Sequence, residues 1–153
     1  MYYDNDNVHG ANAFMEEASD SLPEINPTKV PQVAIEQKMA ETVAAGIYEA
    51  AHLFSDEGLP IAQAASASSQ HVERDRIAEM AILFQDVRRM ASLMGGISRL
   101  REVTIEGENR RKIVFRFFRA FEQQVILAVV VPPNKAYRQR TNELEKLVAG
   151  VSV

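Results

Sequence analysis

The stretch His52–Ala62, with the sequence HLFSDEGLPIA, decides how the rest of the chain is interpreted. An apolar run meets Asp56-Glu57-Gly58, and a second apolar run follows at once. Because Gly58 can adopt a positive φ without steric cost, this pattern predicts a tight β-hairpin. We therefore expect one strand over 47–55 and its hairpin partner over Pro60–Ala65.

The composition is that of an ordinary soluble domain. The chain has 153 residues, of which 46% are hydrophobic and 25% charged, enough for one domain with a substantial core. No apolar run approaches the roughly 20 residues needed to cross a bilayer. The acidic start MYYDNDNVHG is not a secretory signal, so we expect a cytoplasmic protein without membrane insertion. The absence of cysteine excludes disulfides, zinc–thiolate sites and thiol catalysis.

Charge is unevenly distributed along the chain. Residues 1–84 carry 4 of the 17 basic and 14 of the 21 acidic side chains, a balance of −10, whereas residues 85–153 have a balance of +6. Such polarity can support docking or association, and it is also compatible with chance segregation on a solvated surface.

Residues 1–30 differ from the remainder, with six carboxylates against Lys29 alone and two helix-breaking prolines. We expect an acidic, mobile N-terminal arm here and one domain over 31–153. Ala11–Ala18 could form a short helix that shows Phe14 and Met15, which are then candidates to dock on the protein's own groove or on a partner.

A long helix is predicted over 72–94 and is ended by Gly95-Gly96. Its first apolar stripe is Ile77, Met80, Phe84, Val87, Ala91 and Met94. A second stripe is Ile82, Leu83, Met90 and Leu93. One stripe is enough to cover a sheet, so the second requires another helix or another subunit.

The other helices are predicted at the two ends of the domain. Pro31 suits the first turn of a helix that ends near Gly46 and carries a stripe of Ile35, Met39 and Val43. Pro132-Pro133 stops the last strand, and Asn134 is expected to cap a final helix. The stripe of that helix is Tyr137, Leu144, Leu147, Val148 and Val151.

Three strands are predicted between the long helix and the last one. Over 97–106 Val103 and Ile105 alternate, with Leu100 on the opposite face. The strand over 112–119 places Ile113, Phe115 and Phe117 on one side. The continuously apolar run 125–131 is typical of a central strand covered on both faces. With hairpin connections, this order predicts an α+β fold whose sheet is mostly antiparallel.

With these features the chain resembles the roadblock/dynein light-chain family, in particular its bacterial MglB-like branch. The matching features are the hairpin 53–62, the helix 72–94 and the strand 125–131, in one element order over 31–153. The resemblance implies a profilin-like or roadblock sandwich. Its five-stranded sheet would carry the long helix on one face and two helices on the other. Glu57, where members often carry Asp, and the acidic arm depart from the family pattern.

The resemblance also implies a function. Family members form homo- or heterodimers through the middle helix and the edge strand after it. On this chain that interface maps to Ile82, Leu83, Met90, Leu93, Leu100, Val103 and Ile105. Bacterial members commonly bind small Ras-like GTPases and can stimulate hydrolysis. We therefore expect a non-enzymatic dimeric regulator or scaffold of such a GTPase, without cofactor. The alternatives are an adaptor subunit of a larger assembly that binds no GTPase, and a small-ligand sensor.

Two arginines late in the long helix are candidate functional residues. Gln85, Arg88 and Arg89 are expected to form part of a docking surface, since arginine is favoured in interface anchors. Either arginine could instead stabilise phosphoryl transfer in trans. The resemblance implies reshaping of the GTPase rather than a donated arginine. A solvated helix face or an interface ion pair is the plainer interpretation.

Other chemistry is not favoured. Arginines and phenylalanines interleave near Arg116, but a pI of 5.4 suits a nucleic-acid binder poorly, so arginines at the surface and phenylalanines in the core are expected. His9, His52 and His71 lack metal-ligand spacing, and His52 is expected to be a satisfied strand residue. Ser55-Asp56-Glu57 is interpreted as turn chemistry and Gly95-Gly96 as a helix end rather than a phosphate cradle.

Overall fold

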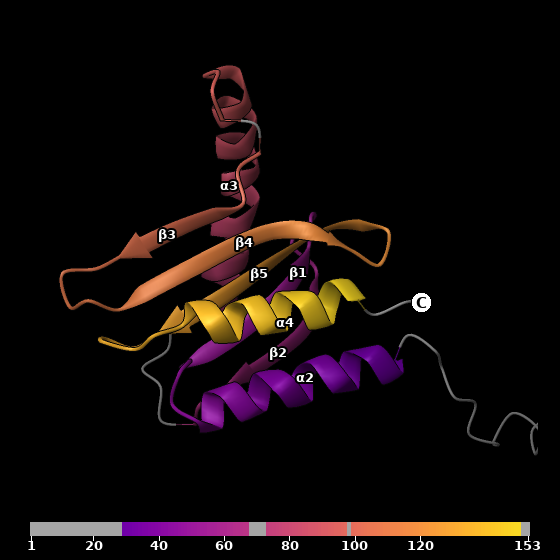
Figure 1. The fold of residues 1–153 in the computed structure, drawn as a ribbon, viewed down its shortest axis with the longest axis vertical. Coiled ribbons are helices and arrows are strands. Elements are labelled where there is room, and N and C mark those ends of the chain that lie inside the picture. Colours follow the sequence, from indigo (N-terminus) through magenta and orange to yellow (C-terminus); the bar gives the residue numbers. More distant parts are fainter. Residues whose placement is uncertain (1–28, 68–72, 98, 151–153) are drawn as a thin grey trace, which may run out of the picture.

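The computed structural model describes residues 29–67, 73–97 and 99–150. These ranges contain eight elements in the predicted order, drawn in Figure 1. They are α2 (Lys29–Ala44), β1 (Ala50–Ser55), β2 (Pro60–Ala65), α3 (Arg74–Leu93), β3 (Glu102–Glu106), β4 (Lys112–Ala120), β5 (Gln123–Val131) and α4 (Arg138–Gly150).

The five strands form one antiparallel sheet in the order β2-β1-β5-β4-β3. α2 and α4 cover one face and α3 covers the other, as Figure 1 shows. The α+β sandwich expected from the sequence is therefore confirmed, including the long helix on one face and two helices on the other.

The apolar run of β5 lies at the centre of the sheet and serves two cores. Successive side chains of a strand point to opposite faces, so the run alternates between the two cores. Val125, Leu127, Val129 and Val131 join the core under α2 and α4. Ile126, Ala128 and Val130 join the core under α3. Full burial of each larger side chain contributes about 1.5–3 kcal/mol, so the uninterrupted apolar run 125–131 stabilises both cores.

The turn between β1 and β2 is the predicted tight hairpin. Gly58 has φ 84°, and its N–H donates to the Ser55 carbonyl at 3.0 Å. Ser55 N–H donates to the Leu59 carbonyl at 2.9 Å. The Ser55 hydroxyl accepts from the backbone N–H groups of Glu57 and Leu59, at 3.3 and 3.1 Å. These bonds confirm the interpretation of Ser55 as a turn residue.

Gly58→Ala is expected to destabilise the protein by about 1–2 kcal/mol, because φ is positive there. An added Cβ would also lie 2.8 Å from Cδ1 of Ile82, a mobile side-chain end that can shift. Gly46→Ala is the matched control, since Gly46 has φ 77° with nothing within 4 Å of the added atom. Urea unfolding measures the loss of stability in both variants. The loss in Gly46→Ala reports backbone strain alone, and any additional loss in Gly58→Ala reports the contact with Ile82. A Gly58→Ala cost below that of Gly46→Ala would contradict the expected crowding.

Some boundaries differ from those expected. Asn134 is not an N-cap: it has φ 62° in the turn before α4, which begins four residues later at Arg138. β3 begins only at Glu102, so strand alternation does not apply to Leu100. Leu100 therefore packs under α3 with Val103 and Ile105 instead of on the opposite face.

Parts of the expected organisation lie outside the described residues. They include the arm up to residue 28, with Phe14 and Met15, and also Val151. The first turn of α2 takes in Lys29 and residue 30, which the sequence assigned to the arm. None of the helices in the described ranges is long and apolar enough to cross a membrane.

Candidate partner-binding surface on α3

α3 rests on the sheet mainly through its N-terminal half. Ile77 and Ala81 are fully buried against the sheet, and the Phe84 ring meets the Phe115 ring edge-on with centroids 4.8 Å apart. The C-terminal half extends past the sheet (Figure 1). Phe84 and Arg88 still lie over Phe115 and Phe117 of β4, but the large side chains on the outer side of that half have no strand beneath them.

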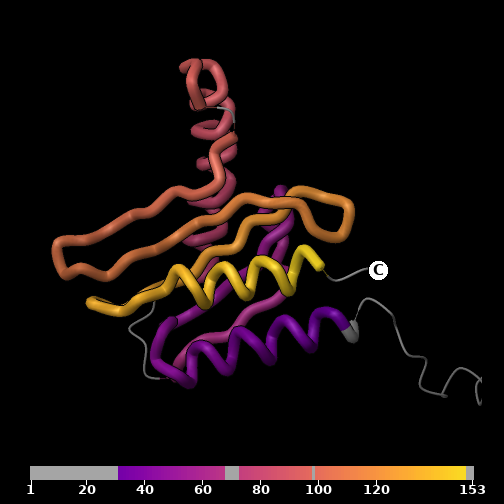
Figure 2. The backbone as a smooth tube through the Cα atoms, in the orientation of Figure 1, coloured from indigo at the N-terminus to yellow at the C-terminus, as the bar shows by residue number. Residues whose placement is uncertain are grey.

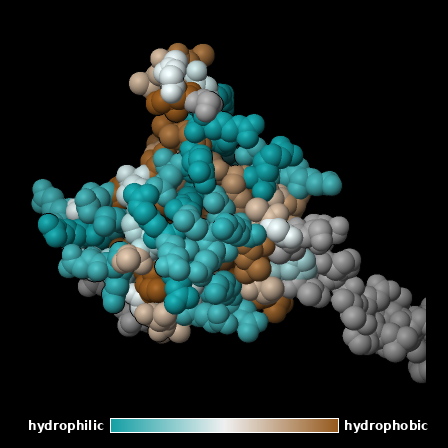
Figure 3. Space-filling view, in the orientation of Figure 1, coloured by the Kyte–Doolittle hydropathy of each residue, from teal (hydrophilic) through white to brown (hydrophobic). Residues whose placement is uncertain are grey.

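From Ile82 onward, α3 and the residues that follow it carry an apolar face, and Figure 3 shows apolar side chains gathered on the extending part of the helix. Leu93 is 86% exposed and Met90 65%. Large exposed apolar patches mark interaction surfaces. The members of the apolar face are Ile82, Leu83, Val87, Met90, Leu93, Met94 and Ile97.

The predicted interface residues fall into two groups. Ile82, Leu83, Met90 and Leu93 are exposed and belong to the apolar face. Val87 and Met94, which the sequence assigned to the sheet-covering stripe, also belong to the apolar face, because the helix extends past the edge of the sheet.

The second group comprises Leu100, Val103 and Ile105, which are half-buried against the core under α3. They lie on or beside β3, an edge strand of the sheet. They contribute to their own core first and are only partly available to a partner.

A polar hollow of about 290 Å³ lies beside α3, and we call it the arginine hollow. It brings together Gln85, Arg88 and Arg89, the three residues predicted for docking. The rest of its lining is Asp56, Ser92, Arg99, Leu100 and Gln124.

Contacts inside the arginine hollow hold some groups and leave others available. Gln85 Nε2 donates to the Asp56 carbonyl, which ties α3 to the hairpin turn. Arg89 pairs with Asp86 at 3.2 Å. The Arg88 guanidinium lies 5.0 Å from the centroid of the Phe117 ring. Among the described residues, neither Arg88 nor Arg99 has a carboxylate within ion-pair distance.

The sequence did not reveal Asp56, Arg99 and Gln124 as part of this surface. They come from the hairpin turn, the segment before β3 and the start of β5. The pairing of Ser55 with Val125 brings the first and last of these segments to one end of the sheet. Only the strand order, which no local pattern encodes, could have grouped them.

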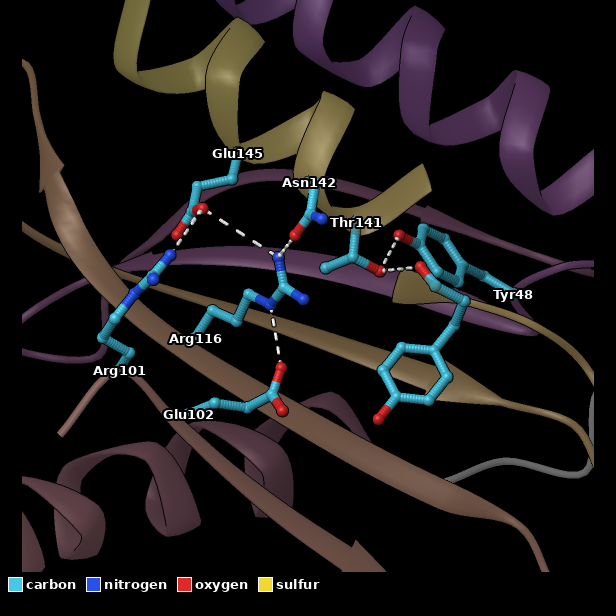
Figure 4. A network of polar contacts seen from close by, with 8 residues as sticks. Tyr48, Arg101, Glu102, Arg116, Thr141, Asn142 and Glu145 are labelled. Carbon is cyan, nitrogen blue, oxygen red and sulfur yellow. Dashed lines mark hydrogen bonds and ion pairs between the residues drawn. The ribbon is translucent and has the colours of Figure 1, made fainter. Parts of the chain in front are cut away.

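A second polar cluster lies under α4, and Figure 4 shows it. Arg116 is 7% exposed and donates through Nε to Glu102 at 2.9 Å and through Nη1 to Asn142 at 2.6 Å. Glu145 lies 3.9 Å from Arg116 and 3.7 Å from Arg101. This cluster joins β3 and β4 to α4.

A neighbouring hydrogen bond anchors α4 to the chain before β1. The Tyr48 and Thr141 hydroxyls are 2.6 Å apart, and the Thr141 hydroxyl is also 2.6 Å from the Tyr137 carbonyl (Figure 4). Burial raises the pKa of Tyr48, so its hydroxyl stays protonated and able to donate.

The expectation of surface arginines along β4 is wrong at Arg116, whose guanidinium is buried because two carboxylates accompany it. Arg111 is likewise paired with Glu49, and Lys112 with Glu106 at 3.6 Å. These ion pairs reduce the positive charge along β4 and argue against a nucleic-acid surface there. The phenylalanines Phe115 and Phe117 are buried as expected.

His52 is buried on β1, but its Nδ1 has no hydrogen-bond partner in the described structure, so the expectation of a satisfied histidine is not met there. Burial, with a smaller contribution from Arg74, lowers the pKa of His52 to about 4. The described residues hold no group of three side chains suited to a metal. His9 and His71 lie outside them.

The buried His52 makes stability decrease as the pH falls. The unfolded chain binds a proton near pH 6.5 and the folded chain only near pH 4, so the His52 contribution is complete above about 6.5. Stability should decrease by roughly 3 kcal/mol in total as the pH falls to about 4. Denaturant unfolding at several pH values measures this slope. His52→Gln, which cannot titrate, should lose the His52 share of the slope while the carboxylate share remains. An unchanged slope would contradict the assignment.

No protein-family model matches the sequence, and no curated protein matches it. Solved structures do match. The gliding protein MglB from Thermus thermophilus is 16% identical with a TM-score of 0.66, over 85% of this chain and 94% of that one. An MglB with a tetrameric arrangement is 17% identical with a TM-score of 0.66, over 85% and 93%. A Roadblock/LC7 domain from Streptomyces avermitilis is 20% identical with a TM-score of 0.54, over 76% and 92%. The chain therefore has the Roadblock/LC7 fold, in the form seen in MglB.

Proposed function

We propose that this chain is a non-enzymatic, dimeric regulator or scaffold that binds a small Ras-like GTPase beside α3. The observation that carries the proposal is the apolar face, a run of exposed side chains on a helix half that has no cover in the described part of its own chain. An apolar surface of this kind needs a partner in water.

Self-association is the first part of the proposal. The apolar face leads along the chain to β3, an edge strand whose outer backbone groups have no strand partner in the sheet. Two copies that met through α3 would also bring two β3 edges together. The tetrameric arrangement of the similar MglB structure favours self-association as well.

Partner docking is the second part. The arginine hollow flanks the apolar face and offers Arg88 and Arg99, whose charges have no carboxylate partner in the described ranges, for a protein with acidic side chains. Ser92 lies in the hollow, but its hydroxyl donates to the Arg88 carbonyl of the same helix at 3.1 Å, so its proton is directed at a backbone oxygen and not at a basic side chain. This arrangement suits binding better than catalysis.

The test combines the protein with the small GTPase encoded nearest to its gene, in both nucleotide states, and measures co-elution and GTP turnover. Arg88→Glu should weaken the complex at least roughly tenfold, since it reverses a charge in the hollow. Arg76→Glu is the matched control, because Arg76 is an exposed residue of the same helix outside the hollow. No complex in either state would overturn the GTPase assignment. Stable complexes with other proteins alone would indicate the adaptor function.

A further inference from the structure

The two polar hollows differ in how far their positive charge is neutralised. Under α4, a hollow of about 230 Å³ includes Arg101, Arg116 and Arg138, but Glu102 and Glu145 pair with the first two. Asp56 also lines the arginine hollow on the α3 side, but it forms no ion pair with Arg88 or Arg99. Asp86 pairs with Arg89, while Arg88 and Arg99 have no carboxylate partner in the described part of the chain. An acidic segment is therefore attracted more strongly to the arginine hollow.

The chain itself contains an acidic segment of matching character. Residues 1–28 carry six carboxylates and no lysine or arginine. Glu16, Glu17 and Asp20 are concentrated in the sequence FMEEASD, directly after Phe14 and Met15. Carboxylates beside apolar side chains complement a hollow in which arginines adjoin Leu100 and the apolar face.

The segment is attached within reach of the hollow. The N-terminal end of α2 lies on the side of the molecule where β1 ends and β5 begins (Figure 2), while α2 itself packs on the sheet face opposite α3. Asp56 and Gln124, which line the hollow, directly follow β1 and lie at the start of β5. The stretch from Asp20 to Lys29 can span up to about 30 Å when extended. A domain of this size is roughly 35 Å across, so the extended stretch spans most of that width, and Glu16 lies up to about 13 Å farther along the chain.

We propose that the acidic segment Glu16–Asp20 of this chain occupies its own arginine hollow and competes there with the protein partner. The competition rests on the proposed function, whereas the docking itself does not. The segment masks Arg88 and Arg99 when no partner is present. Binding of the partner displaces it, so the net charge of the segment sets the affinity of the complex.

A spin label tests the docking without any GTPase. The chain has no cysteine, so Ser19→Cys provides a single attachment site inside the acidic segment. The backbone amide signals of Arg88, Arg99 and their neighbours should lose intensity in the NMR spectrum of the full chain. The triple variant Glu16→Gln, Glu17→Gln, Asp20→Asn should restore them, and so should high salt.

Charge reversals in the hollow provide the matched comparison. Arg88→Glu and Arg99→Glu should each reduce the intensity loss, and Arg138→Glu, the same change under α4, should leave it intact. Intensity loss centred on Arg101 and Arg138, or insensitive to the hollow variants, would overturn the proposal. A mixing experiment separates docking within one chain from docking between subunits. Isotope-labelled protein without a spin label is mixed with spin-labelled protein that carries no isotope. If the signals of the isotope-labelled protein lose intensity, the segment docks on another subunit, and the assignment to the same chain is overturned.

The competition has its own measurement. The triple-neutral arm should bind the partner GTPase about three- to tenfold more tightly than the wild type, because exposed ion pairs are individually weak and three carboxylates are removed. Unchanged affinity together with positive spin-label results would overturn competition while leaving the docking established. Absence of any GTPase complex would overturn the proposed function and leave the spin-label result unaffected.

Discussion

Leu93→Asp is expected to convert the proposed dimer, of about twice 17.1 kDa, into a monomer that remains folded. Leu93 is 86% exposed in the single chain, so an aspartate there costs the fold almost nothing. At a dimer interface the same carboxylate would be buried without a partner, which costs about 3–5 kcal/mol. The dimer dissociation constant should rise by roughly two to three and a half powers of ten.

Light scattering and sedimentation over a range of concentrations measure this effect. Leu83→Asp, on the same face, should act in the same way. Leu59→Asp is the matched control, because Leu59 is 60% exposed at the hairpin turn and outside the apolar face, and it should leave the mass unchanged. A wild-type protein that stays monomeric in concentrated solution would contradict the proposed role of α3.

Arg116→Met is expected to lower the free energy of unfolding by about 2–4 kcal/mol. The change keeps most of the side-chain volume but removes the cation between Glu102 and Glu145. Removing one member of a buried ion pair costs about 3–5 kcal/mol, and the two carboxylates here are 24% and 18% exposed, so solvent recovers part of it. The melting temperature should fall by roughly 10 °C.

Denaturant unfolding of a small set of variants isolates the contribution of the ion pairs. Arg119→Met changes an exposed arginine of the same strand and should shift stability by no more than about 0.5 kcal/mol. Adding Glu102→Gln to Arg116→Met should recover part of the lost free energy of unfolding, because it removes one of the carboxylates left without a cation. Equal effects at Arg116 and Arg119 would contradict the buried network.

The parts of the fold that could be predicted from the sequence are those written in local patterns. Gly58 at a hairpin turn and the apolar run of β5 each encode their own geometry within a few residues. The two stripes of α3 were also visible, because helical periodicity shows which positions share a face. Periodicity alone reveals the second stripe, but which positions are exposed depends also on how far α3 extends past the sheet.

The parts that could not be predicted depend on contacts between distant segments. Arg116 lies on a strand where alternation predicts a solvated position, and only the docking of α4 over it explains its burial. The arginine hollow depends in the same way on sheet order. Asn134 is a residue type favoured at helix N-caps. The turn that contains it continues for several residues before α4 begins, and the preference of a single residue does not predict the length of a turn.

The position of β5 has a consequence for how the protein unfolds. Its side chains fill both cores, so neither helical layer can detach without exposing one whole side of the same strand. The two helical layers therefore belong to one cooperative unfolding unit, because α2, α3 and α4 all pack against the sheet that contains β5. Amide hydrogens at the middle of β5 should exchange with solvent only through complete unfolding. Divided by the intrinsic exchange rate, and where reclosing is faster than exchange, their rates therefore report the global stability of each variant.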